Sequence, residues 1–213
     1  MAKHSVIESD SMRHLYLMRH SKAKKSTSGM ADHQRPLSKR GKRQAAAMAR
    51  VLQRWQALEG DIYVSSAVRT RETLEEVTGQ LPDLALADQA RFEQTLYTFD
   101  GEALLAWLKT LPNEAGRVLV IGHNPALLDL AHWFCRETPS TLPTGSMLYF
   151  TLPETPWSAL EQRCAKLMVS FTPEQASHAL FQRRAPTPPK PCEDDTASLI
   201  RGLLEHQSLM FRS

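Results

Sequence analysis

The chain is poor in cysteine and has no long apolar run. Its three cysteines lie far apart, at Cys135, Cys164 and Cys192. An odd number at these separations argues against a disulfide framework, and the spacing is not that of a metal site. The first ten residues lack the apolar core of a signal peptide, and no later segment approaches the length of a membrane span. We therefore expect a soluble, cytoplasmic protein with no membrane partner.

The chain also lacks a strong net charge and a glycine-rich phosphate loop. The chain has 26 Lys and Arg and 23 Asp and Glu, and the resulting net charge of +3 is too small to indicate a nucleic-acid partner. No nucleotide-binding glycine pattern occurs. Six of the histidines show no ligand-like clustering with carboxylates or cysteines: His4, His14, His33, His132, His178 and His206. We therefore expect no metal and no other cofactor.

Short apolar runs alternate with amphipathic segments along most of the chain. At 213 residues with 42% hydrophobic composition, the chain can form one sizeable α/β domain. Buried strands are predicted at 15–18, 62–64 and 118–121. Helices are predicted at about 38–55, 66–76, 100–111, 125–134 and 172–183. This alternation predicts a mostly parallel sheet in a three-layer α/β/α sandwich.

The end of this pattern predicts an antiparallel edge. Two further strand candidates, 147–152 and 165–171, are separated by prolines and a polar turn. Between 79 and 97 the pattern is weak, so we expect a loop with at most a short strand near 84–86.

Polar residues mark the expected helix starts. Ser38, Ser65 or Ser66, Asp100 and Asn124 precede apolar periodic segments as N-caps, and Asn124 is followed by Pro125 at the first helical position. Thr172 and Gln175 have the spacing of a capping box.

The domain organisation follows from these elements and from composition. We expect a flexible N-terminus at 1–13 and a catalytic domain at 14–184. We expect residues 185–213 to be a proline-rich linker and a C-terminal tail, whose apolar residues could form a short amphipathic helix that docks on this domain or on a partner.

Two histidines follow predicted strands directly. Arg19 and His20 end the run at 15–18, and His123 follows the run at 118–121. Open α/β sheets place their chemistry at the carboxyl ends of strands. Arginine binds phosphoryl oxygens with a fork that stays charged, and a neutral imidazole can attack phosphorus. We therefore assign His20 as a nucleophile, Arg19 and Arg69 as phosphate ligands, and His123 as a further donor to the phosphoryl oxygens.

Four segments in matching order resemble a known family. Residues 17–22 are similar to the Arg-His signature of the histidine phosphatase superfamily, the phosphoglycerate mutase-like proteins, with Ser21 where glycine is usual. Residues 32–41 resemble the Arg-Pro-Leu and Arg-Gly stretch of its SixA-type phosphohistidine phosphatase branch. Residues 64–73 and 120–125 resemble the blocks with the second catalytic arginine and the second catalytic histidine.

The resemblance implies a metal-independent phosphatase with a covalent phosphohistidine intermediate on His20. Arg19, Arg69 and His123 would hold the phosphoryl group, in the phosphoglycerate mutase-like fold. Members that cleave phosphate esters use an acid to protonate the leaving oxygen, and Glu93 is the nearest candidate here. A site poor in proton donors favours phosphohistidine on a protein, because imidazole needs less help to leave than an alkoxide. The basic loop Lys22–Lys25 would suit an acidic docking surface on that protein.

Several alternatives remain open at this stage. The substrate could instead be a small phosphate ester, and the chain could be a phosphate-binding scaffold without catalysis. Arg35 could approach the phosphate or form a structural ion pair. Ser26 is a weak candidate for a hydroxyl donor, and Arg71 is expected on the surface.

Overall fold

The computed structural model describes residues 12–82, 84 and 90–181. A six-stranded sheet has the strand order β3-β2-β4-β1-β5-β6. Its strands are β1 Met12–Arg19, β2 Asp61–Ser65, β3 Ala90–Glu93, β4 Arg117–Gly122, β5 Met147–Pro153 and β6 Lys166–Phe171. The first four strands pair in parallel, whereas β5 and β6 are antiparallel to their neighbours. The mostly parallel sheet with an antiparallel edge is therefore confirmed.

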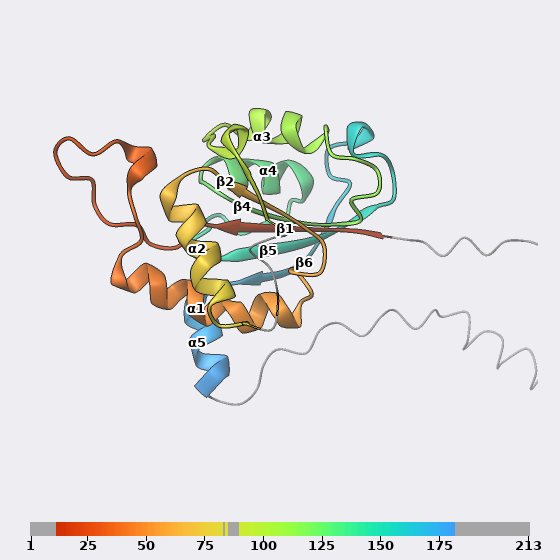
Figure 1. The fold of residues 1–213 in the computed structure, drawn as a ribbon. Coiled ribbons are helices and arrows are strands. Elements are labelled where there is room, and N and C mark those ends of the chain that lie inside the picture. The colour runs from red at the N-terminus through yellow and green to blue at the C-terminus, as the bar shows by residue number, and fades with distance from the viewer. Residues whose placement is uncertain (1–11, 83, 85–89, 182–213) are drawn as a thin grey trace, which may run out of the picture.

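Helices cover both faces of this sheet (Figure 1). On one face lie α1 Lys39–Arg54, α2 Val68–Thr78 and α5 Pro173–Phe181, and on the other lie α3 Gly101–Leu108 and α4 Ala126–Phe134. In β1, Leu15 and Leu17 pack toward α3 and α4, while Tyr16 and Met18 pack toward α1 and α2. All four are fully buried, which is why this strand appears in the sequence as an unbroken apolar run. The three-layer sandwich is confirmed.

The segment that we expected to be mostly loop contains a strand. β3 pairs in parallel with β2 and continues into the 3₁₀ helix η3, Gln94–Leu96. Because β3 lies at the edge of the sheet, Phe92 is 42% exposed and no buried face marks the strand in the sequence. Leu84 lies in a bend, and the rest of the short strand expected near it lies outside the described residues. Two further 3₁₀ helices are η1, Asp32–Gln34, and η4, Trp157–Ala159.

Some predicted helix caps are confirmed. Ser38 caps α1, where its Oγ accepts from the Gly41 amide at 3.1 Å, and Asp100 caps α3. The capping box before α5 also forms, because Thr172 and Gln175 exchange side-chain hydrogen bonds with each other's amides.

Two cap predictions are wrong, because the polar side chains are used elsewhere. Ala67 occupies the cap position of α2, while the Ser65 and Ser66 hydroxyls form hydrogen bonds with other side chains beyond the carboxyl end of β2. Pro125 occupies the cap position of α4, and the Asn124 side chain donates from Nδ2 to the Leu142 carbonyl at 3.2 Å.

The ends of the domain remain predictions. β1 begins at Met12, two residues before the domain start that we expected, and α5 is described as far as Phe181. The expected linker and tail, 185–213, lie outside the described residues.

Candidate active site

The paired strands β1 and β4 place the two predicted histidines side by side. Arg19 is in register with Gly122, so His20 and His123 leave the sheet at the same edge. Their ring centroids are 5.2 Å apart. Arg69, in the first turn of α2, reaches both rings. The structure therefore brings together residues that are more than a hundred positions apart in the chain.

Arg69 lies between the two imidazoles as a shared donor. Its Nε is 3.3 Å from His20 Nε2, and its Nη2 is 3.3 Å from His123 Nδ1. Arginine has no acceptor, so each of these ring nitrogens carries a lone pair. The Arg69 residue is only 2% exposed, which keeps its guanidinium in a fixed place.

The remaining ring nitrogens define the tautomers. His20 Nδ1 donates to the Ser21 carbonyl at 2.8 Å, which leaves Nε2 as the nucleophilic nitrogen. His123 Nε2 donates to Ser65 Oγ at 2.8 Å. Both rings are therefore neutral in this network. The Ser21 amide donates to Thr73 Oγ1 at 3.0 Å, which fastens the turn after His20 to α2.

The environment of both rings favours the neutral form. Burial is the largest cause that lowers the pKa of His20 to about 3, and the charges of Arg69, Arg19 and Arg35 add to it against the opposing Ser21 hydrogen bond. Burial also lowers the pKa of His123 to about 2, with the neighbouring His20 and Arg69 as further causes. Nearby cations thus lower the pKa of both imidazoles, but burial lowers these pKa values more.

Asp32 is a site residue that the motif analysis did not single out. Its carboxylate accepts from Arg69 Nη2 at 3.0 Å, from Arg35 Nη1 at 2.6 Å and from the Tyr97 hydroxyl at 2.9 Å. Burial raises its pKa, but these three hydrogen bonds outweigh burial and lower the pKa to about 2. Between Arg19 and Arg43 it is the single acid in a segment rich in Lys and Arg, and this is the signal in the sequence that could have found it.

Arg19 approaches the site from the end of β1. Its Nη1 donates to the Leu142 carbonyl at 2.8 Å, and Asn124 donates to the same carbonyl. Its Nε is buried and has no hydrogen-bond partner among the described residues. A buried donor without a partner carries a free-energy cost that a bound oxyanion would relieve.

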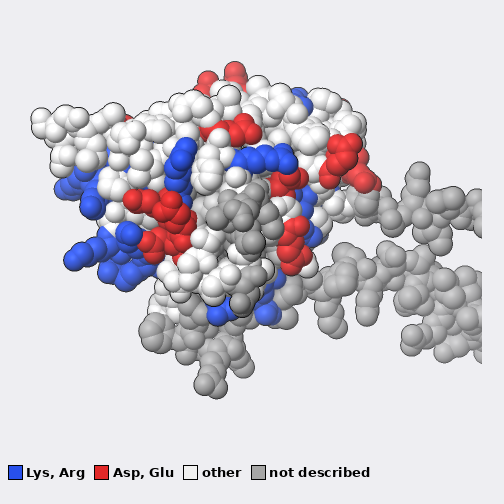
Figure 2. All heavy atoms as spheres, in the orientation of Figure 1, with Lys and Arg blue, Asp and Glu red and all other residues white. Residues whose placement is uncertain are grey.

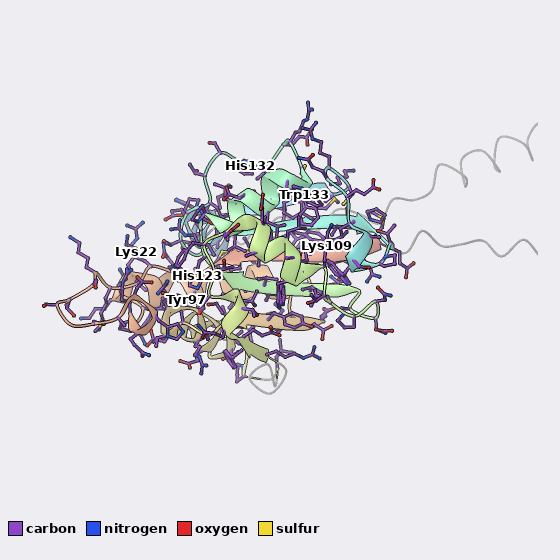
Figure 3. All side chains as sticks on the ribbon, turned by 90° about the horizontal axis from the view of Figure 1, so that it is seen from above. Lys22, Tyr97, Lys109, His123, His132 and Trp133 are labelled. Carbon is purple, nitrogen blue, oxygen red and sulfur yellow. The ribbon has the colours of Figure 1, made fainter. Side chains whose placement is uncertain are left out.

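These groups surround a pocket of about 430 Å³. Its lining consists of Arg19, His20, Lys22, Ala23, Asp32, Arg35, Arg69, Tyr97, Phe99, Asn124 and Thr144. His123 does not line it and lies behind Arg69 and Tyr97, 1% exposed. Viewed from above, Lys22, Tyr97 and His123 lie at one end of the molecule (Figure 3). The lining is strongly cationic and suits an oxyanion.

A larger hollow of about 620 Å³ lies between α3 and α4. Its polar groups are carboxylates, at Asp100, Glu102 and Asp129, and Trp133 forms part of its wall. This charge would repel a phosphate, so the hollow is not the phosphate site despite its size.

The secondary candidates from the sequence fall in different places. Arg35 lines the pocket and also forms an ion pair with Asp32, so both of its suggested roles have support. Glu93 is not in the pocket lining, because its Oε2 accepts from the Trp107 indole at 2.9 Å and from Thr95. Ser26 is exposed outside the pocket lining, and Arg71 is exposed, as expected.

The described part of the chain shows two further features. None of its helices is long and apolar enough to cross a membrane. Within the same residues, no group of three or more His, Cys, Asp or Glu side chains is arranged to hold a metal ion.

The fold agrees with comparisons to solved structures. The tungstate complex of the protein histidine phosphatase SixA has 29% identity and a TM-score of 0.61, and the match covers 75% of this chain and 97% of that one. A candidate phosphohistidine phosphatase SixA from Nakamurella multipartitia has 26% identity and a TM-score of 0.63, covering 76% and 96%. A candidate alpha-ribazole-5'-P phosphatase from Escherichia coli, at 17% identity and a TM-score of 0.53, shares the fold.

Sequence comparisons point to the same group of proteins. An uncharacterized chloroplastic protein of Arabidopsis thaliana is 41% identical over 69 residues, which is 32% of each protein. The chain thus matches about a third of the length of this relative. The model of the histidine phosphatase superfamily (branch 1) matches residues 15–116, which include three of the four predicted site residues. The chain belongs to the histidine phosphatase superfamily.

Proposed function

We propose that this protein is a metal-independent phosphatase that removes the phosphoryl group from phosphohistidine on a protein. His20 is the covalent nucleophile, and Arg19 and Arg69 hold the phosphoryl group. His123, which the sequence analysis assigned as a further donor, contacts Arg69 through Nδ1 and does not line the pocket, so its proposed role is to hold Arg69 in place. Family membership and the similarity to SixA structures support phosphatase activity. The geometry of the pocket supports the roles of the residues and the class of substrate.

In the first step, the lone pair on His20 Nε2 attacks phosphorus. A bond forms between nitrogen and phosphorus, and the bond from phosphorus to the leaving atom breaks, with its electron pair going to that atom. The Nδ1–H bond to the Ser21 carbonyl stabilises the positive charge that develops on the ring. Arg69 has N–H groups beside the reacting nitrogen. These groups can donate to the phosphoryl oxygens in place of the imidazole.

In the second step, water attacks the phosphohistidine of the enzyme. The new oxygen–phosphorus bond replaces the bond to His20 Nε2, which regains its lone pair, and the water proton leaves with phosphate or solvent. Burial keeps His20 neutral before each turnover, since its pKa is lowered to about 3.

The ionisation state of Asp32 is the observation that supports phosphohistidine as the substrate. It is the one carboxyl group in the pocket lining, and three hydrogen bonds lower its pKa to about 2. It is therefore ionised at neutral pH and has no proton to give to a leaving alkoxide. Imidazole is a better leaving group than an alkoxide, so the site favours a phosphorus–nitrogen bond.

A second candidate is a small phosphate ester with a leaving group that needs no proton. The pocket volume of about 430 Å³ lies in the range of small-molecule sites and supports this alternative. We place either activity in a reducing compartment such as the cytoplasm, because Cys135 and Cys164 are free thiols within the described part of the chain.

Phosphate release by wild type and by His20→Ala tests the proposal. The substrates are a phosphohistidine peptide and a panel of phosphate esters. We expect wild type to prefer the peptide and His20→Ala to lose at least about 10³-fold in rate, as for removal of other covalent nucleophiles. His132→Ala, on the exposed face of α4, is the matched control. Equal rates for wild type and His20→Ala would reject nucleophilic catalysis, and a strong preference for esters would reject phosphohistidine.

A further inference from the structure

The mouth of the pocket carries cations that no acid neutralises. Lys22, Lys24 and Lys25 are exposed, and we call these three residues the basic rim. None of them has a carboxylate partner among the described residues. Asp32, the acid nearest in sequence, is occupied by Arg69, Arg35 and Tyr97. Figure 2 shows Lys and Arg side chains gathered at this end of the molecule, below the loop that protrudes in Figure 1.

The backbone of the basic rim is held in place. The Lys24 carbonyl accepts from Arg35 Nε at 3.0 Å and from Arg35 Nη2 at 2.9 Å, while the Lys24 amide donates to the Pro36 carbonyl at 2.8 Å. The Ser38 amide donates to the Lys22 carbonyl at 2.8 Å. Gly41 lies against that carbonyl so closely that a Cβ would be 2.1 Å from its oxygen. The three cations are therefore presented from an ordered backbone that is tied to α1.

An exposed aromatic residue lies in the same area. Phe99 lines the pocket and is 45% exposed, although its ring lies 5.3 Å from the buried ring of His123. Tyr97 packs edge-on against Phe99 at 5.5 Å, which restrains the exposed ring. Protein interfaces combine restrained aromatic anchors with a polar rim, and unpaired cations at the rim select partners of opposite charge.

We propose that the basic rim and Phe99 form a docking surface for an acidic segment that flanks the phosphohistidine of the substrate protein. This inference rests on the proposed function and adds to it a class of partner. Lys22 lines the pocket, whereas Lys24 and Lys25 lie outside it, so the rim extends the contact beyond the phosphoryl group. A solvated basic face would instead show no preference between acidic and neutral partners.

Two synthetic peptides of equal length test the docking surface. Both carry one central phosphohistidine, flanked by glutamates in one peptide and by glutamines in the other. An exposed charge pair changes an equilibrium constant about two- to fivefold, so Lys24 and Lys25 predict about a tenfold higher kcat/KM for the glutamate peptide at low ionic strength. Added salt removes this preference.

Charge reversal assigns the preference to the rim. Lys24→Glu/Lys25→Glu abolishes the preference for the glutamate peptide, mainly through KM, and leaves hydrolysis of phosphoramidate unchanged, since that molecule is too small to reach the rim. The control is Lys166→Glu. Lys166 is exposed at the start of β6, near the amino end of β1, whereas the pocket lies at the carboxyl end of β1. Phe99→Ala lowers kcat/KM for both peptides.

The outcomes separate this inference from the proposed function. Hydrolysis of both peptides at equal rates by wild type would refute the docking surface and leave the phosphatase intact. If wild type hydrolyses neither peptide, the proposed function fails. Fluorescence polarisation with the unphosphorylated peptides then tests the rim alone, and equal binding of the two would refute it.

Discussion

Acid should destabilise the fold through its two buried imidazoles. The unperturbed histidine pKa of about 6.5 applies in the unfolded chain, whereas the folded pKa is about 3 for His20 and about 2 for His123. Between these values the unfolded chain binds protons that the folded protein does not. The free energy of unfolding therefore falls as the pH falls below 6.5, and it is fully regained above it.

The size of this effect follows from the same values. At about pH 5, each imidazole in the unfolded chain lies about 1.5 pH units below its pKa, while both remain neutral when folded. Each unit is worth about 1.4 kcal/mol, so each histidine lowers the free energy of unfolding by about 2 kcal/mol and the pair by about 4 kcal/mol. The total free energy of unfolding of a protein domain is about 5–15 kcal/mol, so a loss of this size is a large fraction of it.

Urea denaturation between about pH 7.5 and about pH 5 measures this loss. His20→Asn/His123→Asn should remove most of the pH dependence, and a smaller part should remain from His14, whose pKa is also lowered, chiefly by burial. His132→Asn is the exposed control and should keep the wild-type dependence. Asp32 adds little above pH 5, because its pKa is lowered from 3.8 to about 2. A double variant with the full wild-type dependence would refute the assignment to these two rings.

Three substitutions test other parts of the structure. Asp32→Asn removes the charge that holds Arg69, so kcat/KM should fall about 10- to 100-fold in a folded protein, and an unchanged value would show that the ion pair does not position this cation. Gly41→Ala places a Cβ 2.1 Å from the Lys22 carbonyl oxygen and should cost about 1–3 kcal/mol in denaturation despite the better helix propensity of alanine; a stabilised variant would contradict this close contact. Arg13→Ala leaves the Asn113 and Thr155 carbonyls without their side-chain donor, whereas the Ala115 carbonyl keeps the Trp157 indole, so the free energy of unfolding should fall by about 2 kcal/mol, and no loss would mean that water replaces the guanidinium.

The sequence predicted the strands that are buried on both faces and the half-buried edge strand β6, but it missed the other edge strand, β3. In β1 and β4, every residue from Leu15 to Met18 and from Val118 to Ile121 is fully buried, so apolar residues alone mark the strand. In β3, side chains are exposed or only half-buried, and pairing with β2 determines the conformation. A strand as exposed as β3 depends on its neighbour for hydrogen bonds and leaves a weak pattern in the sequence, whereas the apolar residues of β6 mark that edge strand.

The site was predictable where it depends on strand ends. His20 and His123 follow strands that pair, and this pairing alone makes them neighbours. The contacts of Asp32 depend on tertiary structure instead. Tyr97 donates to Asp32 across 65 positions, and Arg69 does so across 37. No local pattern links residues at such separations, so a loop acid in a basic segment appeared to be ordinary surface.

The same ion pair explains why the pocket lining has strong cations but no protonated carboxyl group. Arg69 and Arg35 both bind Asp32, which fixes the cation that would hold the phosphoryl group and ionises the only carboxyl group of the pocket lining. Arg35 also donates to the Lys24 carbonyl, so the pair reaches the backbone of the basic rim. An acid that anchors cations cannot also protonate a leaving group at neutral pH. The arrangement that would position the phosphoryl group thus supports our proposal that the substrate has a leaving group that departs without general acid catalysis.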